Sequence, residues 1–506
     1  MYRFFEILPG ALAWGTIFLM VLLSSKLPLA VAVFIILFDT YWLLKTIYLS
    51  FHLRTTFSAM RNNMRTNWLE KLNALDPIHH PPSTTRWSDL YHLIVFPMYD
   101  ESYEVVRDSF ESLCKANYPK ENFLVVLAIE ERAGEPARQT AERITAEYGR
   151  MFGGFMVTTH PAGIPGELPG KGANESWAAR EAERMLLEPR KIPAERVLVS
   201  AFDIDTQIFK EYFGRLTYAF LASSDRLRAI YQPIPLFSNN IYQAPALARI
   251  VAFSATFWQM MQQARVERLT TFSSQSVPLP VLRDIGYWQK DVVSEDSRIF
   301  WQAYLAYHGN FRVVPLFYPV SMDANVTRTF WGTMKSLYRQ QRRWGWGVEN
   351  VPYMLNGFRK DKLIPRAKKW FWSFSALEGF HSWATNSLMI FALGWLPLVL
   401  GGGDFSASLL SYSLPRITRL IIGLSMVGVA TSAILSILLL PPRPRWFRKR
   451  HYFFYVIEWL LIPITLIIFG AFPGLEAQTR LMLGGKWRLG FWVTPKSRIQ
   501  NSETRN

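Results

Sequence analysis

Long apolar runs near both ends of the chain restrict its fold more than any other feature. About 20 consecutive apolar residues are needed to cross a bilayer as a helix. Two such runs lie at the N-terminus, over residues 7–25 and 27–49, with only Lys26 and Pro28 marking the turn between them. A cleavable signal peptide fits the first run poorly, because a second run follows at once without a small-residue cleavage site. We therefore predict a transmembrane hairpin over residues 1–50.

The C-terminal part of the chain carries further apolar runs, over residues 384–400, 420–440 and 452–472. The last run contains Glu458 and Pro463, so it could be a simple span, a split span or a re-entrant hairpin. An additional span could also begin just before the first of these runs. We predict five or six spans in total.

Positive charge beside the apolar runs indicates the orientation of the chain. The sequence has 56 Lys plus Arg against 39 Asp plus Glu, and five basic residues fall within 443–450. Basic loops face the cytoplasm and contact anionic lipids. A disordered basic tail or a soluble nucleic-acid binder would not be half hydrophobic and 15% aromatic. We predict an integral protein of the bacterial inner membrane, with the N-terminus and the central region in the cytoplasm. Membrane lipids are the expected partners, and nucleic acid is not.

One acidic residue, Asp39, falls inside the second apolar run. An ionisable residue at this depth can mark a functional site. A position near the interface, or a pairing with a neighbouring helix, is the favoured interpretation.

The region between the membrane runs alternates short apolar strands with amphipathic helices. Strands are expected over 93–96, 123–129 and 197–202, and helices over 103–115, 136–148 and 173–187. This alternation predicts a mostly parallel sheet covered by helices on both faces. Ligands bind such sheets beyond the carboxyl ends of the strands.

Carboxylates follow each of the three expected strands. They belong to Tyr99-Asp100-Glu101, Glu130-Glu131 and Asp203-Ile204-Asp205. Carboxylates gathered at one edge repel each other, so a cation should lie among them. Mg²⁺ prefers one or two carboxylates together with phosphate oxygens. We therefore predict Mg²⁺ or Mn²⁺ at this edge, bound with a phosphate-bearing substrate.

Three later motifs carry further candidate residues, each with a simpler alternative. Gly170-Lys171-Gly172 could place a lysine near a phosphate at a helix N-terminus, or form a flexible loop. Ser294-Glu295-Asp296 could supply a general base, or cap the helix expected over 297–307. Gln340-x-x-Arg343-Trp344 could bind a diphosphate and a sugar, and could also lie on the membrane surface as an amphipathic helix.

Taken in order, these motifs resemble those of the membrane-embedded family 2 glycosyltransferases, which include the cellulose and hyaluronan synthases. The likeness covers residues 90–350, and the flanking spans fit it. Three motifs depart from the common pattern: Tyr-Asp-Glu replaces Tyr-Asn-Glu, Ser-Glu-Asp replaces Thr-Glu-Asp, and Glu130-Glu131 replaces Asp-Asp or Asp-Gly. The resemblance implies an α/β GT-A-like fold and an inverting transfer of sugar from a nucleotide donor.

The resemblance also implies roles for individual residues. Asp296 would be the general base, supported by Glu295, and Trp344 would receive the acceptor. Donor binding would fall to Tyr99, Glu101, Glu130, Lys171, Asp203, Asp205, Gln340 and Arg343. The metal ligands would be Asp205 and Asp203.

The chain then divides into six expected parts. They are the transmembrane hairpin (1–50), a juxtamembrane linker (51–90), a cytoplasmic GT-A-like domain (91–325), amphipathic interface helices (326–370), C-terminal transmembrane helices (371–475) and a basic tail (476–506).

The expected function is transfer of a sugar to a growing polysaccharide or a glycolipid at the cytoplasmic face, with or without export. Single addition to a lipid-linked acceptor is the alternative. A non-catalytic transporter is disfavoured by the large central region and the ordered motifs, and a non-catalytic scaffold by the presence of both Asp205 and Asp296.

Overall fold

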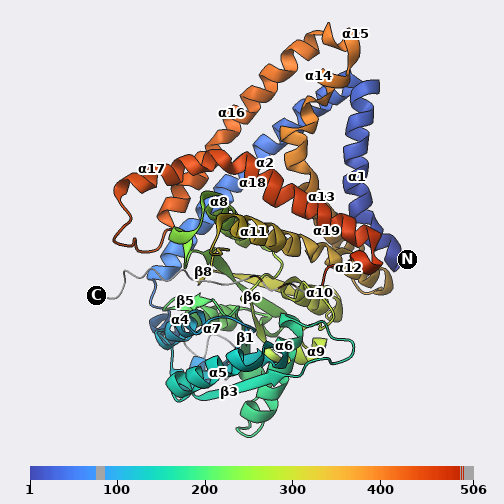
Figure 1. The fold of residues 1–506 in the computed structure, drawn as a ribbon. Helices are drawn as coiled ribbons and strands as arrows, with labels where there is room; N and C mark the ends of the chain where they lie inside the picture. The colour runs from blue at the N-terminus through green and yellow to red at the C-terminus, as the bar shows by residue number, and fades with distance from the viewer. Residues whose placement is uncertain (76–85, 491, 493, 495–506) are drawn as a thin grey trace.

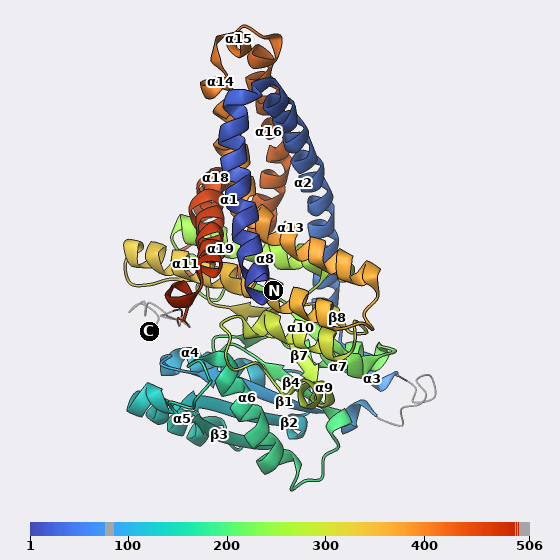
Figure 2. The ribbon, with the colours of Figure 1, turned by 90° about the vertical axis from the view of Figure 1, so that its right-hand side faces the viewer.

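The structure, a computed structural model, describes residues 1–75, 86–490, 492 and 494. An α/β domain lies at one end of an elongated bundle of helices (Figures 1 and 2). The short helices α14 (Leu396–Leu400) and α15 (Gly402–Ser406) lie at the other end of the bundle. The N-terminus lies where the bundle meets the domain (Figure 2).

Eight strands form one sheet in the order β3-β2-β1-β4-β7-β6-β8-β5. Their bounds are β1 Tyr91–Met98, β2 Phe123–Glu130, β3 Gly154–His160, β4 Val197–Ala201, β5 Gln207–Ile208, β6 Ala229–Phe237, β7 Ser276–Pro278 and β8 Arg312–Met322. The first four strands in this order are parallel. Strand β7 runs antiparallel to β4 and β6, β8 is parallel to β6, and β5 is antiparallel to β8. The three expected strands are confirmed, and the sheet is mixed in its second half.

Helices cover both faces of the sheet, as expected. Successive strand residues point to opposite faces, so Ile94 and Phe96 of β1 pack on one side while Leu93 and Val95 pack on the other. The first side is covered by α4 (Tyr103–Cys114), α5 (Gly134–Tyr148) and α7 (Tyr212–Ala222). The second is covered by α6 (Lys171–Ala182), α9 (Leu279–Ile285), α10 (Glu295–Ala306) and α12 (Asn350–Lys360). Both faces are thus fully buried, which explains why the strands read as continuous apolar runs.

The bundle is built from helices long enough to cross a membrane. Four described helices meet the length and hydropathy needed: α1 (Tyr2–Lys26), α2 (Pro28–Arg65), α16 (Leu409–Leu438) and the composite segment 449–483. A fifth candidate is α13 (Arg366–Phe391) continued by α14, with a bend of 45°. The described residues thus hold four helices, or five with the bent pair, that are long and apolar enough to cross a membrane, against the five or six spans expected. Helix α2 continues without a break past residue 50, where the expected linker begins.

The composite segment 449–483 consists of α17 (Lys449–Ile457), α18 (Ile462–Leu466) and α19 (Phe472–Leu483), joined by irregular helical turns. Tyr242 donates a hydrogen bond to the Pro441 carbonyl just before this segment, and Arg488 just after it pairs with Glu6 of α1. Both ends therefore lie near the α/β domain, and the segment passes between domain and bundle (Figure 1). The basic residues after α19 accordingly lie on the domain side, which a simple crossing would not allow. The rest of the basic tail, 495–506, lies outside the described residues.

Asp39 of α2 is buried within the bundle, with Thr418 of α16 in reach. Neither carboxylate oxygen of Asp39 has a hydrogen-bond partner among the described residues, so the expected position near the interface or pairing with a neighbouring helix stays a prediction.

Glu476 of α19 ties the composite segment to α11 (Phe330–Gly345). Its carboxylate accepts hydrogen bonds from Tyr338 at 2.9 Å and from Arg342 and Arg480 at 2.7 Å each. We expect Glu476→Gln to lower the midpoint of thermal unfolding in detergent, because hydrogen bonds to charged groups contribute about 1.5–3 kcal/mol each before partial exposure reduces them.

The control for this prediction is Glu142→Gln, on the exposed face of α5, which should leave the midpoint unchanged. Equal midpoints for both variants would contradict a stabilising role for Glu476.

Candidate functional site

The candidate site lies where parallel strands end together. Strands β1, β2 and β4 run in one direction side by side, so the residues that follow them reach the same edge of the sheet. The N-termini of α6 and α10 meet at this edge, because Gly172 of α6 packs against Glu295 of α10.

Lys171 is the central charge of the site. Its Nζ lies 2.8 Å from Asp203 Oδ1, 2.9 Å from both carboxylate oxygens of Asp296 and 3.6 Å from Glu175 Oε1. Burial alone would lower the pKa of this ammonium group, but Asp203, Asp296 and the further carboxylates outweigh burial and raise it well above its usual value. Three residues that the sequence placed in separate motifs are thus in direct contact.

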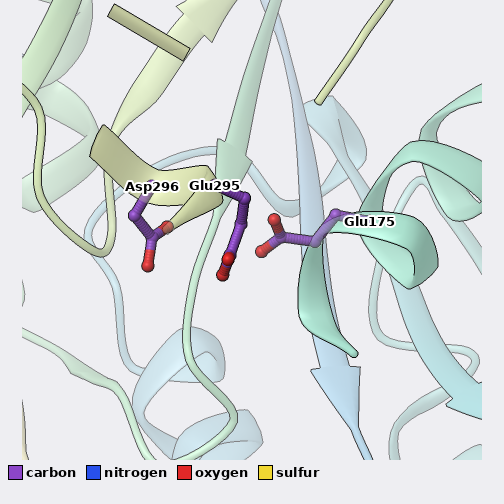
Figure 3. A group of neighbouring side chains, drawn as sticks. All are labelled: Glu175, Glu295 and Asp296. Carbon is purple, nitrogen blue, oxygen red and sulfur yellow. The ribbon is translucent and has the colours of Figure 1, made fainter. Parts of the chain in front are cut away.

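Two further carboxylates lie behind this contact (Figure 3). Glu175, Glu295 and Asp296 each have one carboxylate oxygen that lies within 4.8 Å of the matching oxygens of the other two. A metal ion could be held at this spacing. The Lys171 ammonium, however, already supplies a cation to this group. Glu175 was not identified from the sequence, although its i,i+4 spacing from Lys171 on one helix face was an available signal.

Gly172 has a packing function. A Cβ at this position would lie 2.9 Å from Glu295 Cβ and 3.0 Å from the Gln289 carbonyl oxygen. Real Cβ atoms essentially never approach within 3.0 Å of another heavy atom. The glycine after Lys171 therefore permits the close approach of α6 and α10 that brings the lysine to Asp296.

The two aspartates after β4 have different surroundings. Asp203 Oδ2 accepts a hydrogen bond from Ser273 at 2.8 Å, while its Oδ1 contacts Lys171. Asp205 is 2% exposed, and its Oδ2 accepts a hydrogen bond from the Asp323 backbone N–H at 3.0 Å. Asn239 donates to both the Asp205 carbonyl and the Asp323 carboxylate. Asp323 was missed in the sequence, although it directly follows β8.

The residues after β1 and β2 form a second group. Glu130 is buried and pairs with Arg132, whose guanidinium lies 4.3 Å from the centroid of the Tyr99 ring. Glu101 accepts a hydrogen bond from the Tyr99 backbone N–H at 2.8 Å, which fixes the turn after β1. The structure thus brings Tyr99, Glu101 and Glu130 together and adds Arg132, while their role in donor binding stays a prediction.

Helix α11 carries the last motif. Gln340 accepts a hydrogen bond from Asn325 at 3.3 Å, and Trp344 packs against Phe237 and Phe272, each with ring centroids 5.7 Å away. Gln340, Trp344 and Asp323 help to line a small pocket between α11, α8 (Ala246–Gln263) and the ends of β6 and β8.

The neighbouring arginines of α11 have different partners. Arg343 approaches Glu295 closely enough to oppose the rise of its pKa, while Arg342 binds Glu476. Arg343 thus belongs to the carboxylate group around Lys171, and Arg342 to the contact with α19.

Comparison with known proteins gives similarity only at the level of solved structures. No protein-family model and no curated protein matches the chain. A mannosyltransferase from Pyrobaculum calidifontis, PcManGT, solved with GDP-Man and Mn²⁺, is similar over 77% of this chain and 99% of its own, with 12% identity and a TM-score of 0.42. S. aureus TarS 1–349 with UDP-GlcNAc is similar over 79% of this chain and 93% of its own, with 12% identity and a TM-score of 0.37. The expected membership of family 2 stays a prediction.

Proposed function

We propose that this protein is a membrane glycosyltransferase that moves a sugar from a nucleotide-sugar donor to a hydroxyl group of a glycan or lipid acceptor. The observation that carries the proposal is the convergence of Lys171, Asp203 and Asp296, which come from three motifs and meet within 2.9 Å. Arg343 joins this group from α11. A base and two cations around one point at a sheet edge suit the displacement of a diphosphate by a hydroxyl group.

The proposed reaction is a direct, inverting displacement. Asp296 accepts the proton of the acceptor hydroxyl as the new bond to the anomeric carbon forms and the bond to the diphosphate breaks. Lys171 and Arg343 stabilise the negative charge that develops on the departing diphosphate. Phosphate oxygens compete with Asp296 for Lys171, so donor binding frees the Asp296 carboxylate to act as a base.

The residues present fit a divalent cation. Carboxylate oxygens suit Mg²⁺ or Mn²⁺, and such an ion would neutralise charge on the diphosphate. The two aspartates after β4, Asp205 and Asp203, would hold such an ion.

The proposed location is the cytoplasmic face of the bacterial inner membrane, in contact with membrane lipids. The basic residues after α19 lie on the side of the α/β domain, as the positive-inside rule requires of a cytoplasmic domain. The pocket beside Trp344 lies between α11 and α8, so we place the acceptor there. A growing polysaccharide and a single lipid-linked acceptor both suit this position.

The test is nucleotide release by the full-length protein purified in detergent. A panel of nucleotide sugars is offered with Mg²⁺ or Mn²⁺, with and without a lipid extract as the source of acceptor. We expect release from one donor, increased by the extract. Absence of release from every donor under all conditions would overturn the proposal.

A further inference from the structure

Two buried carboxylates near Asp296 have no part in the reaction described above. Glu175 is fully buried and Glu295 is 2% exposed, and they face each other from α6 and α10 (Figure 3). Neither oxygen of Glu175, nor Oε2 of Glu295, has a hydrogen-bond partner among the described residues. Burial without such partners is costly for an ionised carboxylate, more so for two in contact.

The charged groups with the largest effect on the pair come from four elements. Lys171 lies on α6, Asp203 follows β4, Asp296 lies on α10 and Arg343 lies on α11. If all four carboxylates were ionised, four negative charges would face the two positive charges of Lys171 and Arg343. Lys171 already binds both Asp203 and Asp296. Burial raises the pKa of both Glu175 and Glu295, and for Glu295 the charge of Asp296 raises it further.

We propose that Glu175 and Glu295 share one proton at neutral pH, and that Glu175 thereby acts as a positioning residue that limits the negative charge beside Asp296 and Lys171. A proton between the two carboxylates provides a hydrogen bond for Glu175 and for Oε2 of Glu295, which otherwise have none among the described residues. A bridging metal ion is the competing occupant, but the Lys171 ammonium lies 3.6 Å from Glu175 Oε1, where a second cation would be repelled.

The shared proton has a consequence for donor binding, which rests on the proposed function. At alkaline pH the pair loses its proton and gains a second negative charge. This charge repels the donor diphosphate, so the donor KM rises and kcat/KM falls on the alkaline side. In Glu175→Gln the amide donates to Glu295 and the pair carries one negative charge at most, so this alkaline fall is lost.

The first experiment needs no catalytic activity. Infrared spectra of the native protein at neutral pH are compared with those of Glu175→Gln, and of Glu181→Gln as a control on the same helix. We expect a carboxylic acid C=O band in the native protein that disappears on raising the pH, is absent in Glu175→Gln and persists in Glu181→Gln. Its absence from the native protein, or its persistence in Glu175→Gln, would overturn the shared proton.

The second experiment records donor kcat/KM against pH for the native protein, Glu175→Gln and Glu175→Asp. We expect the alkaline fall in the native protein and in Glu175→Asp, which keeps an ionisable group, and its loss in Glu175→Gln. Identical alkaline limbs in all three would overturn the positioning role. An inactive native protein with the infrared band present would instead count against glycosyl transfer alone.

Discussion

Replacement of Asp296 by asparagine should lower acceptor-dependent nucleotide release by about 10²–10⁴-fold, the range that a general base contributes. Asparagine has nearly the same shape as aspartate but cannot accept the proton of the acceptor hydroxyl. The fold should persist, because Lys171 keeps its ion pair with Asp203 at 2.8 Å. The loss should therefore fall on kcat, with the donor KM changed much less, as measured by steady-state nucleotide release.

The matched control for this prediction is Asp291→Asn, an exposed acid five residues before Asp296 whose carboxylate accepts a hydrogen bond from Gln289. Its rate should equal that of the native protein. Unchanged release in Asp296→Asn would remove the base from the proposed reaction, and equal losses in both variants would indicate a general effect on this loop.

The three strands that the sequence revealed carry unbroken apolar runs buried on both faces, whereas β6, which is equally buried, was not predicted because Gln232, Pro233 and Pro235 interrupt its run. The three are β1, β2 and β4, and their burial leaves a continuous apolar signal. Strands β5 and β7 have two and three residues, which is too short for any periodicity to register. They exist because their partners β8, β4 and β6 supply the hydrogen bonds, and this non-local pairing leaves no mark on the local sequence.

The path of the segment 449–483 could not be read from hydropathy. Its composition equals that of a spanning helix, but Glu458 pairs with Arg249 of α8 at 2.8 Å and Glu476 with Arg342 of α11 at 2.7 Å. These contacts hold the segment against α8 and α11. The sequence showed the acidic residue in the apolar run but not the arginine that it meets.

The sequence revealed candidate residues because the functional side chains of a parallel sheet lie in the segments that follow its strands. Asp203 and Asp296 were identified on that basis or by resemblance, and both lie in the site. The contact of Lys171 with Asp296, 125 residues away, depends on how α6 and α10 pack. Glu175 escaped notice because an acid on a helix is normally solvated, and only the packing of α10 against α6 buries it.

Gly172→Ala should reduce nucleotide release by about 100-fold, although Gly172 itself takes no part in the chemistry. The added Cβ would lie 2.9 Å from Glu295 Cβ and 3.0 Å from the Gln289 carbonyl. Neither atom is the end of a flexible side chain, so α6 and α10 must move apart. A displacement of about 1 Å between catalytic groups is enough for such a loss, and overpacking costs about 1–3 kcal/mol of stability.

Gly347→Ala is the matched control, because a Cβ there would lie 3.7 Å from the Phe380 ring and 4.0 Å from Ser297 Oγ, which are ordinary contacts. The added methyl group fits at this position without moving α10, so this variant should keep native activity. A native rate in Gly172→Ala would show that the spacing of α6 and α10 is not critical. Loss of the folded protein would be seen as a lower unfolding midpoint, so activity should be measured well below that midpoint. Under that condition, a reduced rate in Gly172→Ala alone assigns the loss to the separation of Lys171 from Asp296.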